Sequence, residues 1–179
     1  AMDQYVWELA CKELQRWKEQ GKEEYYISVN VSPRDFYFLD IYQTLTTLVE
    51  CYDVKPELLH LEITETSVMK DASKQLALID ELRNYGFHIV MDDFGRGYSS
   101  LNMLQDMNLD AIKIDMEFLR RNEDPERSRM ILEMVLNLAA ELGISVVTEG
   151  VEQKDQLRYM QELGCTLFQG FYFAKPMPV

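Results

Sequence analysis

The chain has 179 residues, of which 47% are hydrophobic and 27% charged, and its 31 Asp and Glu against 18 Lys and Arg give a net charge of −13. This length and composition suit one soluble globular domain with a sizeable core. No apolar run reaches the roughly 18 residues of a membrane span, and the first residues lack a signal-peptide pattern. The acidic surplus argues against a nucleic-acid polymer as partner, because such binding relies on basic patches. We therefore expect a cytoplasmic protein with no membrane segment within these residues.

Histidine and cysteine are scarce in this sequence. The three cysteines, Cys11, Cys51 and Cys165, form no CxxC pair, and we expect them to be reduced and buried. The two histidines, His60 and His88, are expected to pack in the interior. A histidine-rich zinc site is therefore excluded, and any metal would be held by oxygen atoms, which favours Mg²⁺ or Mn²⁺.

Helical and extended patterns alternate along the chain. Helices are expected at about residues 3–20, 41–52, 71–86, 124–143 and 157–163, and strands near 25–31, 58–63, 87–92, 110–115, 144–149 and 166–171. In the helix that begins at Asp124-Pro125, the expected buried face consists of Ile131, Met134, Val135, Leu138 and Leu142. Strands that alternate with helices indicate βαβ units and a parallel sheet.

The strands share a second pattern, in which one face is apolar and the other ends in a polar residue at the carboxyl end. In the first strand, Val29 and Val31 take one face and Ser28 and Asn30 the other. This layout predicts a TIM-like (β/α)₈ barrel of class α/β, with its active site at the carboxyl mouth. A doubly wound sheet is the alternative, although it would bind its ligand at one switch point. A barrel needs eight strands and about 250 residues, so the first two strands and about 70 residues are expected to precede Asp3.

The polar residues at the strand ends suggest a metal site. The set consists of Asn30, Glu62, Asp92, Asp93, Lys113, Asp115, Glu149, Glu152 and Gln169. Carboxylates that face one mouth repel each other unless cations neutralise them. The adjacent pair Asp92-Asp93 could contact two ions, and two metals about 3.5–4 Å apart can activate a water and hold both oxygens of a phosphoryl displacement. A lysine in such a site can orient the water and offset developing negative charge.

Six segments, in this order, resemble those of the EAL-domain family of cyclic di-GMP phosphodiesterases. They are Val29-Asn30-Val31-Ser32, residues 61–65 (LEITE), 92–101 (DDFGRGYSSL), 113–115 (KID), 149–152 (EGVE), and Gln169-Gly170 followed by Lys175-Pro176. The resemblance extends from about residue 6 to the C-terminus, and it implies a barrel fold. It also implies that residues 1–179 are the C-terminal three quarters of an EAL domain, without its first two barrel strands.

The resemblance implies two metal ions, Mg²⁺ or Mn²⁺, with ligands from several strand ends. Asn30, Glu62 and Asp92 resemble the ligands of the first ion, and Asp92 and Asp93 those of the second. Glu149 resembles a residue that binds metal or water and acts as general base. Each of these residues follows or ends one of the expected strands.

The remaining site residues are also assigned by resemblance. Lys113 resembles the family lysine near the attacking water, with Asp115 in support. Glu65 resembles the residue that anchors the loop after the Asp-Asp pair, and it is grouped with these catalytic residues. Gln169 and Glu152, together with Asp93, would line the substrate site.

The implied activity is metal-dependent hydrolysis of cyclic di-GMP to linear pGpG in bacterial second-messenger signalling. The implied partners are a second copy of the chain, in a homodimer, and an upstream cyclase-like or sensory domain. The chain departs from the family pattern in two places. The Glu-Ala-Leu segment, whose glutamate is a metal ligand, is absent, and Arg96 stands where a small residue is usual.

Two other functions remain open at this stage. One is a non-catalytic EAL-like module that binds cyclic di-GMP or partner proteins, which the absent Glu-Ala-Leu segment favours. The other is an enolase-type lyase or isomerase barrel, which the tandem Asp92-Asp93 fits poorly. Retention of every visible acidic position favours the phosphodiesterase.

Overall fold

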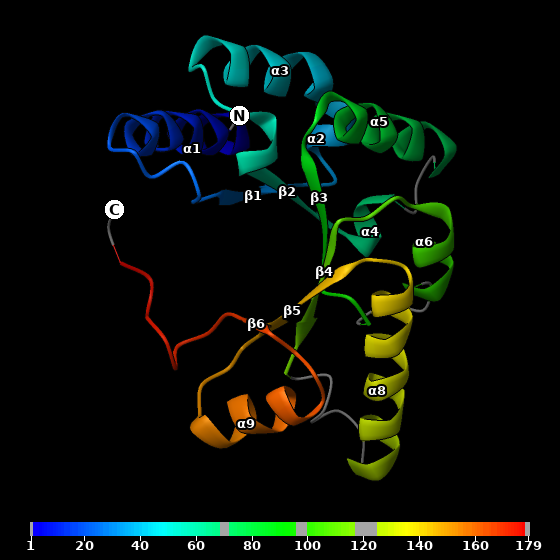
Figure 1. Ribbon diagram of the computed structural model, residues 1–179. Helices are drawn as coiled ribbons and strands as arrows, with labels where there is room; N and C mark the ends of the chain where they lie inside the picture. Colours follow the sequence, from blue (N-terminus) through cyan, green and yellow to red (C-terminus); the bar gives the residue numbers. More distant parts are fainter. Residues whose placement is uncertain (1, 69–71, 96–99, 117–124, 178–179) are drawn as a thin grey trace. The chain divides into compact units, whose positions relative to one another are not determined.

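The protein is described from a computed structural model, which places residues 2–68, 72–95, 100–116 and 125–177 (Figure 1). The chain divides into two compact units. The first unit contains the described residues up to Met91 and residues 100–109, and the second contains residues 92–95, 110–116 and 125–177. Among the described residues, no helix has the length and apolar character to cross a membrane.

The first unit alternates helices with three strands. Its elements are α1 (Met2–Glu19), β1 (Ile27–Val31), α2 (Asp35–Phe38), α3 (Ile41–Cys51), the 3₁₀ helix η1 (Pro56–Leu58), β2 (Leu59–Thr64), α4 (Glu65–Val68), α5 (Ala72–Tyr85), β3 (His88–Asp92) and α6 (Ser100–Asp106). β1 pairs with β2 in parallel, with Val29 opposite Leu61 and Asn30 opposite Glu62. Helix α1 contacts β1 and α3, and α3 contacts α5 (Figure 1).

The core of the first unit follows the alternation expected from the sequence. Val29 and Val31 are buried, while Ser28 and Asn30 on the opposite face are exposed. Trp7, Cys11 and other apolar residues of α1 are buried. Burial of these apolar side chains is the main force that holds α1 on β1.

The second unit repeats the arrangement with β4 (Ala111–Asp115), α8 (Pro125–Glu141), β5 (Ser145–Glu149), α9 (Lys154–Glu162) and β6 (Leu167–Phe168). β4 and β5 are parallel, and so are β5 and β6. Strand order follows chain order within each unit, β1-β2-β3 and β4-β5-β6. The predicted α/β class, with six parallel strands among the described residues, is confirmed, and each expected strand is present, although β6 has only two residues.

The buried face predicted for α8 is wrong. Met134 is 66% exposed, and Ile131, Leu138 and Leu142 are also exposed. The buried positions are Ser128, Leu132 and Ala139, and Val135 is half-buried. The helix carries a second stripe at helical spacing, which consists of Ser128, Leu132, Val135 and Ala139. This stripe is the more buried one, and α8 contacts β5.

The cysteines and histidines also differ in part from expectation. All three cysteines are free, but Cys51 is exposed, because it is the last residue of α3, on the side away from Leu45 and Val49. His60 and His88 are half-buried rather than fully interior. The His60 ring stacks between two others, with its centroid 3.9 Å from that of Tyr26 and 4.6 Å from that of His88.

Candidate functional site

Lys113 forms ion pairs with two of the predicted acidic residues in the second unit. Its Nζ lies 2.6 Å from Glu149 Oε1 and 3.7 Å from Asp92 Oδ1. The lysine side chain is 7% exposed, and the two carboxylate side chains are 18% and 19% exposed. An ammonium group at this depth is costly without partners, so the two carboxylates compensate its burial.

The backbone at Asp93 is strained. Asp93 has φ +56°, a left-handed conformation that costs about 1 kcal/mol or more for a residue with a Cβ. Its N–H donates to Asp92 Oδ1 at 2.9 Å, which holds the Asp92 side chain against the turn. The N–H of the next residue, Phe94, donates to the carbonyl of Lys113 at 3.0 Å. The turn after Asp92 is therefore fastened to the strand that carries the lysine.

Asp115 lies beside the loop that follows Glu149. The register of β4 and β5 places Asp115 opposite Glu149. The N–H of Met116 donates to the Glu149 carbonyl at 3.1 Å, and Asp115 Oδ1 lies 3.2 Å from the position that a Cβ on Gly150 would occupy. Asp115 therefore lies against the backbone that follows Glu149.

Gln169 and Glu152 are both exposed in the second unit. The backbone of Gln169 bridges two segments, because its N–H donates to the Thr148 carbonyl at 2.8 Å and its carbonyl accepts from the Val151 N–H at 3.2 Å. At Gly170 a Cβ would lie 2.5 Å from the Val151 nitrogen, and closer still to the Val151 carbonyl oxygen. Only glycine allows this approach, which brings the backbone of Gln169 next to the segment after Glu149.

The first unit contains the other predicted site residues. Asn30, near the end of β1, is exposed, and Glu62, opposite it on β2, is 8% exposed. Glu65, the first residue of α4, is 4% exposed. Arg96 lies outside the described residues.

The oxygen donors of this set fit a hard divalent cation. Asp92 and Glu149 supply carboxylate oxygens around one buried ammonium, and Asn30 and Glu62 supply an amide and a carboxylate, which are donors that Mg²⁺ and Mn²⁺ prefer. Within the part of the chain that the structure describes, no three His, Cys, Asp or Glu side chains are gathered closely enough to hold an ion by themselves. The assignment of particular metal ligands therefore stays a prediction.

Sequence reasoning missed the residues that support Asn30. The Trp7 indole N–H donates to the Asn30 carbonyl at 3.0 Å. Two residues further on, the Ser32 N–H and hydroxyl both donate to Asp35 Oδ2, at 2.8 and 2.6 Å. The Ser-x-x-Asp spacing of 32–35 is a helix-start signature and could have indicated this turn. No local pattern indicates the bond from Trp7.

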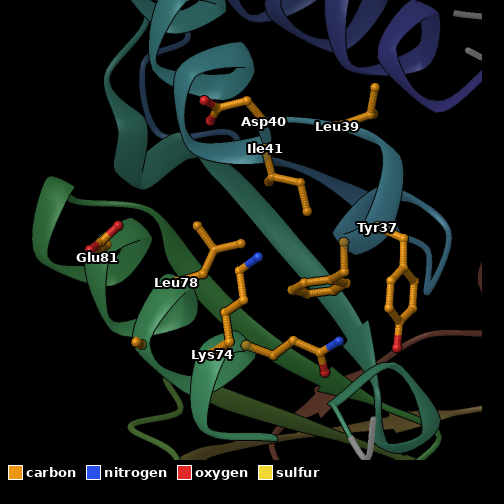
Figure 2. Close-up of a pocket in the computed structure, with 10 residues that line it drawn as sticks. Tyr37, Leu39, Asp40, Ile41, Lys74, Leu78 and Glu81 are labelled. Atoms are coloured by element: carbon orange, nitrogen blue, oxygen red, sulfur yellow. The ribbon is translucent and has the colours of Figure 1, made fainter. Parts of the chain in front are cut away.

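A groove of about 520 Å³ in the first unit contains none of the predicted site residues. Figure 2 shows Lys74, Leu78 and Glu81 of α5 on one side and residues of the α2–α3 segment, among them Tyr37 and Ile41, on the other. The groove is also lined by Gln75, which is 4% exposed and whose Oε1 has no hydrogen-bond partner. It is therefore a feature separate from the strand-end residues.

Parallel βα units with carboxylates and a buried lysine at the carboxyl ends of the strands define an enzyme of the (β/α)-barrel type. A sequence model of the family described as EAL domain matches residues 1–176. The chain therefore belongs to the EAL-domain family, as its motifs predicted.

Named relatives and solved structures agree with this assignment. The chain is 34% identical over 179 residues to cyclic di-GMP phosphodiesterase RocR of Pseudomonas aeruginosa. The matched region covers 99% of this chain and 46% of RocR. It is 31% identical to the bifunctional diguanylate cyclase/cyclic di-GMP phosphodiesterase MucR of the same organism, over 98% of this chain and 26% of MucR. The chain thus spans less than half the length of either relative.

Two solved structures show the fold with ligands. The MucR phosphodiesterase in complex with cyclic di-GMP superposes with a TM-score of 0.91 at 31% identity, over 99% of this chain and 72% of that one. The manganese and cyclic di-GMP complex of Klebsiella pneumoniae BlrP1 gives a TM-score of 0.82 at 29% identity, over 98% of this chain and 46% of that one.

Proposed function

We propose that this chain is part of a metal-dependent phosphodiesterase that hydrolyses cyclic di-GMP to linear pGpG in bacterial second-messenger signalling. The observation that carries the proposal is the position of Lys113, whose ammonium group contacts Glu149 and Asp92 at the ends of two strands. Support also comes from the relatives, which are named as cyclic di-GMP phosphodiesterases.

The residues of this chain would each perform one task in the hydrolysis. Glu149 would accept the proton of the attacking water, because its carboxylate lies at a strand end, 2.6 Å from the ammonium nitrogen of Lys113. Lys113 would hold that carboxylate in place and offset the negative charge that develops on the phosphoryl oxygens. Asp115 would support the loop after Glu149, and Gln169, Glu152 and Asp93 would contact the substrate.

The proposed metal ligands are Asn30, Glu62, Asp92, Asp93 and Glu149. A bound divalent pair supplies activation of water and stabilisation of charge on the phosphodiester. The proposal of two Mg²⁺ or Mn²⁺ ions rests on the oxygen donors of these residues and on the manganese complex of BlrP1. The role of Glu65 as anchor of the loop after Asp93 is part of the same proposal and is supported by its burial.

Three further proposals concern the whole protein. We expect two barrel strands before residue 1, an upstream cyclase-like or sensory domain, and a homodimer. MucR, which is named as both a cyclase and a phosphodiesterase and is about four times longer than the matched region, supports the second of these. A cytoplasmic location follows from the proposed substrate.

We expect the chain alone to be impaired, because the glutamate of the Glu-Ala-Leu segment is absent. The direct test is therefore to extend the chain N-terminally by about 70 residues, to incubate it with cyclic di-GMP and Mn²⁺, and to measure pGpG by chromatography. The Glu149→Gln variant keeps the size and hydrogen-bonding capacity of the side chain but cannot accept the proton, so we expect a loss of at least about 100-fold in turnover. Near-normal turnover of this variant would contradict the proposed role.

A second experiment tests the non-catalytic alternative. Calorimetric titration with cyclic di-GMP, with and without Mn²⁺, measures binding independently of turnover. A nucleotide-binding module would bind cyclic di-GMP without releasing pGpG. This result should then hold also for the chain extended N-terminally by about 70 residues, to a typical barrel length.

A further inference from the structure

Helix α1 holds the end of β1 at two points. Trp7 is 0% exposed, and its Nε1 donates to the carbonyl of Asn30 at 3.0 Å. One turn earlier on the same helix, Asp3 Oδ2 lies 3.2 Å from the Ser32 hydroxyl, whose single proton is shared with the nearer Asp35 Oδ2. Asn30 and Ser32 flank Val31, so both contacts act on the three residues at which β1 ends.

We propose that Trp7 is a positioning residue that fixes the orientation of Asn30 as a metal ligand. This inference rests on the proposed function, in which Asn30 binds a divalent cation. Trp7 itself would not contact the metal or the substrate. It would act through the backbone of Asn30.

The geometry of β1 explains why such support is needed. β1 is the first strand in the sheet order of the described residues, and β2 is its paired neighbour there. The Asn30 side chain is on the exposed face, so its direction depends on the orientation of its own backbone. Metal–ligand distances tolerate about 0.2 Å of error, and a backbone carbonyl fixed from a helix restricts the rotation of the peptide next to Asn30.

The tryptophan at position 7 supplies a hydrogen-bond donor as well as a buried ring. A buried indole N–H needs an acceptor, and here the acceptor is the Asn30 carbonyl itself rather than a group elsewhere. The ring is fully buried, and it lies on the same buried face of α1 as Cys11 and Leu14. Packing alone would need only an apolar ring, whereas the N–H adds a bond at a defined point of the strand.

The test measures Mn²⁺ affinity by electron paramagnetic resonance, without substrate. Trp7→Phe removes the N–H, and we expect it to weaken Mn²⁺ binding about tenfold, as is typical when a residue that supports a metal ligand is lost. Asn30→Ala should weaken binding at least as much. In the Asn30→Ala background, Trp7→Phe should have no further effect, because the residue that it positions is already lost.

Two controls separate positioning from folding. Trp17→Phe removes the other indole of α1, which is partly exposed and packs edge-on against Tyr25, and it should leave Mn²⁺ affinity unchanged. If Trp7→Phe does not fold, the sulfur isostere of tryptophan, 3-benzothienylalanine, introduced at position 7 keeps the ring shape and removes only the N–H. It should reproduce the tenfold loss with an unchanged unfolding midpoint.

The outcomes distinguish this inference from the proposed function. An unchanged Mn²⁺ affinity of the position-7 variants, or equal losses with and without Asn30, would overturn the role of Trp7 alone. An unchanged affinity of Asn30→Ala would instead remove Asn30 from the metal ligands, and with it both the proposed ligand set and this inference.

Discussion

The ammonium nitrogen of Lys113 lies 2.6 Å from Glu149 Oε1, although the two residues are on different strands. The register of β4 and β5 places Lys113 opposite Val147, so the lysine side chain extends towards the carboxyl end of the neighbouring strand to meet Glu149. Asp92 is a second partner of the lysine, so two acidic residues of the second unit lie beside one ammonium group.

Removal of Lys113 should destabilise the protein, and divalent cations should reverse the loss. Lys113→Met leaves Glu149 and Asp92 without their cation, and we expect a decrease of about 2 kcal/mol in the free energy of unfolding, less than the 3–5 kcal/mol typical of fully buried pairs because both carboxylates are partly exposed. Mn²⁺ should raise the unfolding midpoint of this variant more than that of the unchanged protein.

The matched control is Lys55→Met, which removes the pair between Lys55 and Glu23 at 3.4 Å. Both of its side chains are more than half exposed, so the loss should be below about 1 kcal/mol. Equal losses for the two lysines, or equal responses to Mn²⁺, would show that Lys113 does not neutralise the strand-end carboxylates.

Gly170→Ala should be more destabilising than an alanine at another glycine with positive φ. The added Cβ would overlap the backbone of Val151, and we expect a loss of about 3 kcal/mol in urea unfolding. Gly164→Ala is the control, because Gly164 has φ +93° but no atom within 4 Å of the added Cβ, and it should cost about 1 kcal/mol. A smaller loss at Gly170 than at Gly164 would contradict the close approach to Val151.

Cys11 should make the protein less stable at high pH. Burial, with the Glu8 carboxylate as a smaller cause, raises the pKa of Cys11 from 9.0 to about 12. The unfolded chain then loses this proton at a lower pH than the folded protein. The contribution of Cys11 to the free energy of unfolding is therefore complete below pH 9 and is lost as the pH rises towards 12, by about 1.4 kcal/mol per pH unit.

Urea unfolding at pH 8 and pH 10 measures this effect. Cys11→Ala should show a smaller decrease between the two pH values than the unchanged protein, while Cys51→Ala, at an exposed position, should behave like the unchanged protein. A thiol reagent at pH 8 should accordingly modify Cys51 and leave Cys11 unreacted. Parallel pH dependence of all three proteins would contradict the assignment.

Gln75→Met should be neutral or stabilising. The buried Gln75 Oε1 has no hydrogen-bond partner, so an apolar side chain of similar shape removes a desolvation cost of up to about 1 kcal/mol. Gln43→Met is the control, since the Gln43 amide donates to Thr47 Oγ1 at 3.0 Å on the surface, and its loss should be slightly unfavourable. A decrease of more than about 1 kcal/mol for Gln75→Met would show that the amide has a favourable role in the groove.

The order of the elements and the polar residues at the strand ends could be predicted from the sequence alone. The alternation of Val29 and Val31 with Ser28 and Asn30 predicts which face of β1 is buried, because successive side chains of a strand point in opposite directions. The same rule assigned Glu62 to the polar face of its strand, and the register of the two strands sets it opposite Asn30. These are local properties, set by the geometry of a single segment.

Which surfaces and groups contact each other depends on how the elements pack in three dimensions, and the sequence pattern does not predict it. The two apolar stripes of α8 are equivalent by periodicity, and packing on β5 buries the stripe of Leu132 and Ala139. The bond from Trp7 to Asn30 joins residues 23 positions apart, and no pattern within either segment encodes it. Hydrophobic periodicity reports that a face is apolar, whereas its partner depends on how the elements fit together in three dimensions.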